Sequence, residues 1–205
     1  MLDVINYANL LQYSPRGKGE ISIKSQAITG AIKGGRISPS IPKLIIKHGA
    51  YLADFLNEEV TLVPTPRSSP IRETDLWPTL EIVKMLAALK LGNISTCLFR
   101  TTPVKKSSQN YTGEHRPSIL EQYNSLAVKN VVPTSNITLV DDVVTMGRTS
   151  IAAASRLAEK FPNANIRLFA LVRTMGFVDD IDIIEKCEQG TITYYPASGK
   201  CFRSP

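Results

Sequence analysis

The chain has 205 residues, of which 43% are hydrophobic and 20% are charged, and this composition suits one ordinary globular domain. The apolar runs are only a few residues long, and no basic stretch with an apolar core follows Met1, so we expect neither a membrane span nor secretion. The three cysteines form no CxxC pair, which argues against a disulfide framework and a zinc site and favours a cytoplasmic protein.

The net charge of +6 is unevenly distributed along the chain. Residues 1–50 are rich in lysine and arginine, whereas residues 177–188 are acidic. A basic N-terminal half can meet nucleic acid or a phosphorylated ligand, but it can equally be a solvated surface that keeps the protein soluble. Charge alone leaves both interpretations open.

Short β-rich runs alternate with longer helical segments, which predicts an α/β architecture with a largely parallel sheet. The patterns are clearest in a core of residues 41–176 and weakest in the N-terminal segment 1–40 and the C-terminal segment 177–205. Residues 3–12 are compatible with a short helix. The other expected elements are a helix over 42–57, a strand over 60–63, a helix over 78–91, strands over 94–99, 126–128 and 137–140, a helix over 148–161 and a strand over 166–172.

The most informative segment follows the buried strand at 137–140 and leads directly into a helix. Successive backbone N–H groups in such a loop, together with the positive end of the helix, form an anion site, and the hydroxyls of Thr145 and Thr149 can donate to phosphate oxygens. Gly147 lacks a Cβ, so we expect the backbone to approach the anion closely there and a branched substitute to exclude phosphate without unfolding the protein. The predicted phosphate-binding residues are Val144, Thr145, Met146, Gly147, Arg148 and Thr149.

Two adjacent carboxylates, Asp141 and Asp142, stand between the strand and this loop. Ionised aspartate accepts hydrogen bonds, so the pair suits the hydroxyl groups of a ribose whose phosphate lies a few ångström away. Ligands of open α/β sheets bind at this carboxyl edge of the strands. The alternatives are a metal site or an ordinary strand end.

An apolar strand, two acids and the run Val-Val-Thr-x-Gly-x-Thr together resemble the motif with which type I phosphoribosyltransferases bind 5-phosphoribosyl-1-pyrophosphate (PRPP). Within that superfamily, residues 60–175 are most similar to the ComF proteins, through Val-Pro-Thr-Pro-Arg at 63–67, Arg100 and the strand at 168–174. Two features differ from ComF proteins: the cysteine-rich N-terminal zinc module is missing, and Arg-Glu-Thr-Asp-Leu-Trp at 72–77 replaces the usual Arg-Gly-Phe-Asn.

The resemblance implies a type I phosphoribosyltransferase fold, with a mainly parallel central sheet flanked by helices and a small hood built from the terminal segments. It also implies that the segment 100–116 closes over PRPP as a lid that carries Lys105 and Lys106 to the leaving group. A solvated charged loop would have the same composition. The residues that would bind the pyrophosphate are Thr65, Pro66, Arg67, Ser68 and Arg100, although a proline-rich turn would give a similar pattern at 65–68.

The activity that the resemblance implies is Mg²⁺-dependent transfer of ribose 5-phosphate from PRPP to an unknown acceptor, with release of pyrophosphate. Asp141 and Asp142 would orient the ribose and favour its developing positive charge, while Arg67 with Lys105 or Lys106 would stabilise the leaving group. Mg²⁺ would be bound mainly through PRPP, with no direct protein ligand. The alternatives are a non-catalytic PRPP-sensing regulator and a ComF-like protein of DNA uptake or processing that binds nucleic acid. A homodimer is left open.

Overall fold

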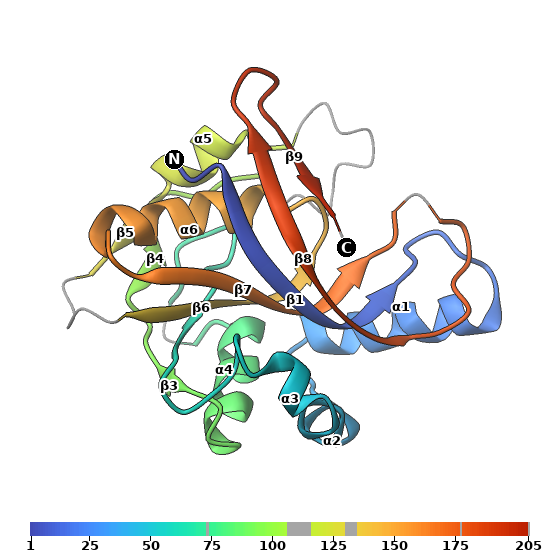
Figure 1. The fold of residues 1–205 in the computed structure, drawn as a ribbon. Coiled ribbons are helices and arrows are strands. Elements are labelled where there is room, and N and C mark those ends of the chain that lie inside the picture. The colour runs from blue at the N-terminus through green and yellow to red at the C-terminus, as the bar shows by residue number, and fades with distance from the viewer. Residues whose placement is uncertain (73, 106–115, 130–134, 177, 205) are drawn as a thin grey trace.

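A computed structural model describes residues 1–72, 74–105, 116–129, 135–176 and 178–204. It confirms the predicted α/β architecture: a mostly parallel, seven-stranded sheet carries helices on both faces (Figure 1). The strand order is β3-β2-β6-β7-β1-β8-β9, in which the five strands from β3 to β1 are parallel and β8 and β9 are antiparallel to their neighbours. The strands of this sheet are β1 (Val4–Tyr13), β2 (Thr61–Pro64), β3 (Asn93–Ile94), β6 (Asn136–Val144), β7 (Asn165–Thr174), β8 (Glu185–Tyr195) and β9 (Lys200–Arg203).

Two apolar cores lie on the two faces of the sheet. Along β6, Leu139 belongs to the core on the α6 side and Val140 to the core on the α4 side, because successive strand residues point to opposite faces. A strand buried on both faces reads as a nearly continuous apolar run, which explains why β7 and the first half of β6 were predicted. The end of β6 was predicted too early, because the strand continues through the acid pair to Val144. One face carries α1 (Glu20–Lys33), α2 (Ser40–Lys47), α3 (Gly49–Leu52) and α4 (Pro78–Ala88), and the other carries α5 (Ile119–Asn124), α6 (Arg148–Lys160) and the two-stranded antiparallel sheet of β4 (Leu98–Arg100) and β5 (Leu126–Val128).

The predicted strands at 60–63 and 126–128 and the predicted helices at 78–91 and 148–161 are confirmed to within a few residues. The strand expected at 94–99 is wrong, because its two ends belong to different sheets as β3 and β4. The helix expected over 42–57 is broken at His48, which ends α2 before the short α3 begins.

The N-terminal segment does not form the short helix expected over residues 3–12. It forms β1, which lies between β7 and β8 inside the main sheet. The run from Tyr7 to Leu10 is fully buried on both sides, so no exposed face alternates with a buried one to mark the strand in the sequence. The segment after residue 177 returns to the sheet as β8 and β9, so both terminal segments supply strands to the main sheet.

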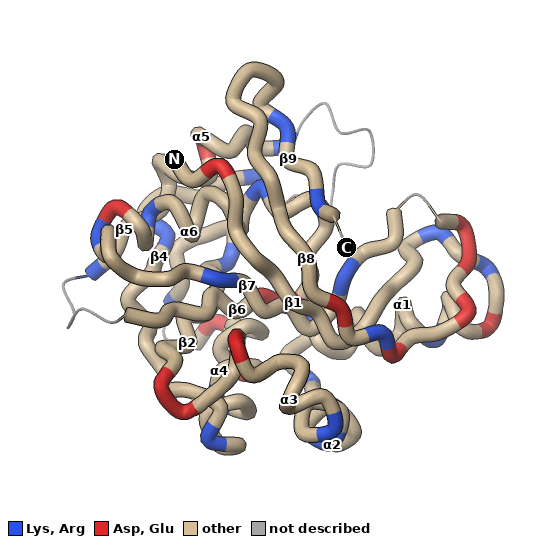
Figure 2. Tube along the Cα trace, viewed as in Figure 1, with Lys and Arg blue, Asp and Glu red and all other residues tan. Residues whose placement is uncertain are grey.

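Part of the basic charge in the N-terminal half is matched by the acidic segment that precedes and begins β8 (Figure 2). Glu185 accepts from Lys47 at 2.6 Å and from His48 at 2.9 Å. Asp180 accepts from the backbone N–H of Gly19 at 2.8 Å, at the start of α1. Within the described ranges, no helix is both long and apolar enough to cross a membrane.

Candidate functional site at the carboxyl ends of β2 and β6

The predicted site residues come from two strands that are neighbours in the sheet. After β2 the chain passes through α4 to β3 on one side, and after β6 it passes through α6 to β7 on the other side. The two helices also cover opposite faces of the sheet. A crevice opens at such a reversal of strand order, and open α/β sheets bind their ligands there.

The loop after β2, residues 65–68, lies directly beside the acid pair of β6. Pro64 is opposite Val140 in the strand register, and the Thr65 N–H donates to the Val140 carbonyl at 2.8 Å. The Thr65 carbonyl in turn accepts from the indole N–H of Trp77 at 2.9 Å and from the Thr79 hydroxyl at 2.7 Å. These three bonds fix the loop next to Asp141 without using the Thr65 side chain, whose buried Oγ1 has no hydrogen-bond partner within the described residues.

Arg100, which was predicted to bind pyrophosphate, lies beneath the 65–68 loop with its guanidinium bonded to protein groups. It is only 4% exposed, and burial lowers its pKa to about 10, so it remains a cation at neutral pH. Its Nε donates to the Arg67 carbonyl at 2.6 Å, and its terminal nitrogens donate to Ser125 Oγ and, at 3.0 Å, to Gln122 Oε1. The structure therefore gives Arg100 a supporting place under the loop.

The Arg67 side chain and the Ser68 backbone lie near the carboxyl edge of the sheet, where each makes one hydrogen bond. The Arg67 guanidinium is half-buried and donates through Nη1 to the Leu76 carbonyl at 2.8 Å. The Ser68 carbonyl accepts from the Val104 N–H at 2.7 Å, which joins the start of the predicted lid to the 65–68 loop. Hydrogen bonds with the backbone and hydroxyl of Ser118 lower the pKa of the Glu121 carboxyl, and the charge of exposed Lys105 lowers it a little further. Lys106, the other predicted lid cation, lies outside the described residues.

The acid pair lies near the C-terminal end of β6, and each carboxylate accepts a hydrogen bond from the following backbone N–H. Asp141 Oδ1 accepts from the Asp142 N–H at 3.0 Å, and Asp142 Oδ1 accepts from the Val143 N–H at 2.8 Å. Burial raises the pKa of the Asp141 carboxyl well above its usual range, and the charge of Asp142 raises it further. The ammonium of Lys33, at the end of α1, opposes this shift. An acid with a raised pKa in a cleft is typical of a functional group.

The 144–149 loop turns the chain from β6 into α6 and leaves the first turn of that helix without a side-chain cap. Gly147 is the N-terminal capping residue in the left-handed conformation, with φ of 81°, and its carbonyl accepts from the Ile151 N–H at 2.9 Å. The amides of the first turn have no partner inside the helix, so they are donors for an anion. Thr145 is exposed, and its hydroxyl lies 3.3 Å from that of Thr174 at the end of β7.

The role expected for Gly147 needs a correction. A Cβ at this position would lie 2.5 Å from Cγ2 of Ile192, a fully buried residue of β8, and not against the open side of the loop. Gly147 is therefore required by its positive φ and by the packing of β8 beneath the loop. A branched side chain there should strain the fold, contrary to the expectation that it would only exclude phosphate.

Three residues at this edge were missed by sequence reasoning: Lys33, Thr174 and Arg203. Arg203 of β9 donates to the carbonyls of Val144 at 3.0 Å and Thr145 at 2.7 Å, although it follows the loop by more than fifty residues. Lys33 and Arg203 belong to no local motif, and Thr174 only ends the matched strand at 168–174. Their only signal is the charge or hydroxyl itself, which many surface residues share.

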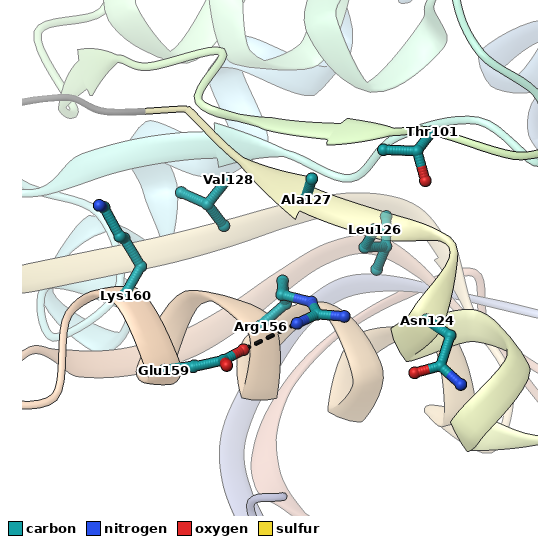
Figure 3. A pocket seen from close by; sticks show the side chains of 8 residues that line it. All are labelled: Thr101, Asn124, Leu126, Ala127, Val128, Arg156, Glu159 and Lys160. Atoms are coloured by element: carbon teal, nitrogen blue, oxygen red, sulfur yellow. Dashed lines mark hydrogen bonds and ion pairs between the residues drawn. The ribbon is translucent and has the colours of Figure 1, made fainter.

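A separate hollow of about 480 Å³ lies at the opposite end of α6 (Figure 3). Its lining includes Arg156, which stacks 3.7 Å from the centre of the Tyr123 ring and pairs with Glu159 at 2.8 Å. It contains none of the predicted site residues. Within the described part of the chain, no three His, Cys, Asp or Glu side chains gather in a way that could hold a metal ion.

No protein-family model matches the chain, and no curated protein matches it in sequence. A functional assignment therefore depends on the residues of this chain and on their geometry.

Proposed function

We propose that this protein binds PRPP at the carboxyl ends of β2 and β6, on a type I phosphoribosyltransferase fold, and transfers ribose 5-phosphate to an acceptor. The observation that carries the proposal is the place of the acid pair. Asp141 and Asp142 lie at the reversal of strand order, between the uncapped start of α6 and the 65–68 loop. A ribose with a phosphate at one end and a pyrophosphate at the other needs this order of groups.

Each end of the ligand has donors of a suitable kind. The Thr145 and Thr149 hydroxyls and the amides at the start of α6 would take the 5-phosphate, as in other helix N-terminal anion sites. The Arg67 guanidinium would take the pyrophosphate together with the Thr65 hydroxyl, which has no partner among the residues that the structure describes. Arg100 would hold the 65–68 loop from below. Asp141 and Asp142 would accept hydrogen bonds from the hydroxyl groups of the ribose.

In the transfer step, the bond from the anomeric carbon to the pyrophosphate oxygen breaks and a bond to the acceptor forms, with loss of a proton from the acceptor. The anomeric carbon becomes positively charged, and the two carboxylates stabilise that charge while cations stabilise the leaving group. Bound Mg²⁺ would neutralise part of the pyrophosphate charge. Asp141 and Asp142 would hold the ribose, and the metal would be bound mainly through the ligand.

Thermal unfolding with and without PRPP and Mg²⁺ tests the binding site. We expect PRPP with Mg²⁺ to raise the Tm of the wild type, because a ligand that binds only the folded state stabilises it by mass action. Asp141→Asn combined with Asp142→Asn should abolish the rise. Asp54→Asn removes an exposed acid outside the site and should leave the rise intact. No rise in the wild type, or an undiminished rise in the double variant, would contradict the proposed ribose site.

Turnover is tested separately, with PRPP labelled in its β-phosphate. The label is followed as released pyrophosphate in the presence of Mg²⁺ and a panel of bases, amines, RNA and DNA. Acceptor-dependent release would establish transfer and identify the acceptor class. Binding of PRPP without release across the panel would instead identify a non-catalytic sensor.

A further inference from the structure

The last strand of the chain places a cation directly behind the 144–149 loop. Arg203 of β9 donates through Nη1 to the carbonyls of Val144 at 3.0 Å and Thr145 at 2.7 Å, and through Nη2 to the carbonyl of Thr174 at 2.8 Å. One guanidinium thus joins the loop after β6 to the end of β7. Lysine cannot copy this arrangement, because its donors radiate from one nitrogen and do not form a planar fork.

These bonds fix the direction of the loop peptides. All the described peptide bonds are trans, so the C=O and the N–H of one peptide group point in opposite directions. Because Arg203 holds the Thr145 carbonyl, the Met146 N–H of the same peptide points away from Arg203. That amide precedes the uncapped first turn of α6, where the other candidate phosphate donors lie.

Arg203 is half-buried, and none of the carboxylates that the structure describes forms an ion pair with it. Arg173 of β7, a buried arginine nearby, pairs with Glu188 at 2.8 Å, and the charge of Glu188 also favours the cationic form of Arg203. Burial lowers the pKa of Arg203 to about 10, so the side chain stays charged at neutral pH. A half-buried cation without an ion pair among the described residues leaves positive potential at the loop, which an anion bound there would balance.

We propose that Arg203 is a positioning residue for the monophosphate group of the ligand. It acts through the backbone: it orients the peptides of the 144–149 loop and adds positive potential behind them, while the loop amides contact the phosphate. The inference rests on the proposed function and extends it, because it makes the C-terminal strand part of the ligand site. The substituent recognised in this way is a phosphate monoester, as in ribose 5-phosphate.

The test compares two ligands by isothermal titration calorimetry: ribose 5-phosphate, which needs the 144–149 loop, and inorganic pyrophosphate, which would use the 65–68 loop. Arg203→Met should weaken ribose 5-phosphate binding about tenfold or more, as expected for the loss of charge-assisted hydrogen bonds that orient the site. Pyrophosphate affinity should change by less than about twofold. Arg167→Met is the matched control, because Arg167 also bonds to a backbone carbonyl, that of Asp54, but from the opposite end of β7. It should bind both ligands as the wild type does.

Arg203→Lys covers the case in which the methionine variant does not fold. This variant keeps the positive charge but loses the planar arrangement of guanidinium donors, so it should also bind ribose 5-phosphate more weakly. In ¹⁵N NMR spectra, ribose 5-phosphate should no longer shift the Met146 and Gly147 amide signals as it does in the wild type. Unchanged ribose 5-phosphate affinity in a folded Arg203→Met or Arg203→Lys variant would overturn the role of Arg203. An equal loss for both ligands would overturn it too, by showing a general structural effect. Failure of the wild type to bind ribose 5-phosphate would instead contradict the proposed function itself.

Discussion

The contact between Gly147 and Ile192 gives a prediction whose magnitude can be worked out from the structure. In Gly147→Ala, the new Cβ would lie 2.5 Å from Cγ2 and 2.7 Å from Cδ1 of Ile192, which is fully buried in β8. Real Cβ contacts are not this short, so the loop or the strand must move. The alanine must also adopt a φ near 81°, which costs a non-glycine residue about 1–2 kcal/mol.

The two costs can be separated because the chain offers a matched glycine. Gly199, between β8 and β9, also has a positive φ, of 64°, but a Cβ there would have open space around it. Gly199→Ala should therefore cost only the conformational strain, about 1–2 kcal/mol. Gly147→Ala should cost that amount plus about 1–3 kcal/mol for the steric clash in a packed core, which gives a total of roughly 2–5 kcal/mol.

Urea unfolding followed by circular dichroism measures both values, with Ile192→Ala as a third change. Ile192→Ala is destabilising by itself, but it removes the atoms that the new Cβ would meet. In that background, Gly147→Ala should cost no more than Gly199→Ala does, so the double-mutant cycle should show a favourable coupling. Equal costs for the two glycine changes in the wild-type background, or no coupling with Ile192, would refute the packing explanation.

Three further results are expected. The raised pKa of Asp141 means that its protonated form favours the folded state, so this stability is present below the usual aspartate range and is lost as the pH rises through the folded pKa. Asp141→Asn should therefore raise the Tm of the ligand-free protein at neutral pH, with little effect at pH 3, whereas Asp54→Asn should change neither; a lower Tm at neutral pH would contradict the raised pKa of Asp141. Arg100→Met should lower the free energy of unfolding by about 3 kcal/mol in urea titrations, because it leaves buried acceptors unpaired, and a change below about 1 kcal/mol would contradict the supporting role. If the chain is a transferase, Lys105→Ala with Lys106→Ala should lower kcat much more than PRPP affinity, whereas equal losses would show that the lysines act in ground-state binding.

The sequence predicted the parts of the fold that are encoded by short, continuous patterns. Residues 137–150 show a strand buried on both faces, two acids and a loop that opens a helix, and each of these features depends on neighbouring residues alone. The strand at 60–63 and the helix at 78–91 were found for the same reason. These elements bring the 65–68 loop and the acid pair to one edge of the sheet. Local sequence patterns do not predict that the two segments meet, and only the family resemblance implied it.

What the sequence did not reveal is non-local. The run at residues 4–13 becomes a strand because it pairs with β7 and β8, and nothing within the run distinguishes such a strand from a buried helix. The strands β8 and β9 follow a polar connection, and their long-range pairing with β1 decides their structure. The direction in which a Cβ at Gly147 would point also depends on β8, so the function of that glycine could not be read from the loop.

These non-local strands change how the phosphate motif should be understood. Ile192 of β8 packs beneath the loop at Gly147, and Arg203 of β9 fixes the carbonyls of Val144 and Thr145. A peptide with the sequence of residues 137–150 would have the same hydroxyls and amides, but nothing would hold those amides on one side. Because anion binding by a loop requires its N–H groups to converge, the geometry belongs to the assembled sheet more than to the motif. Arg203 should accordingly affect ligand affinity as much as the threonines of the loop do, which a comparison of Arg203→Met with Thr149→Val in ribose 5-phosphate binding would measure.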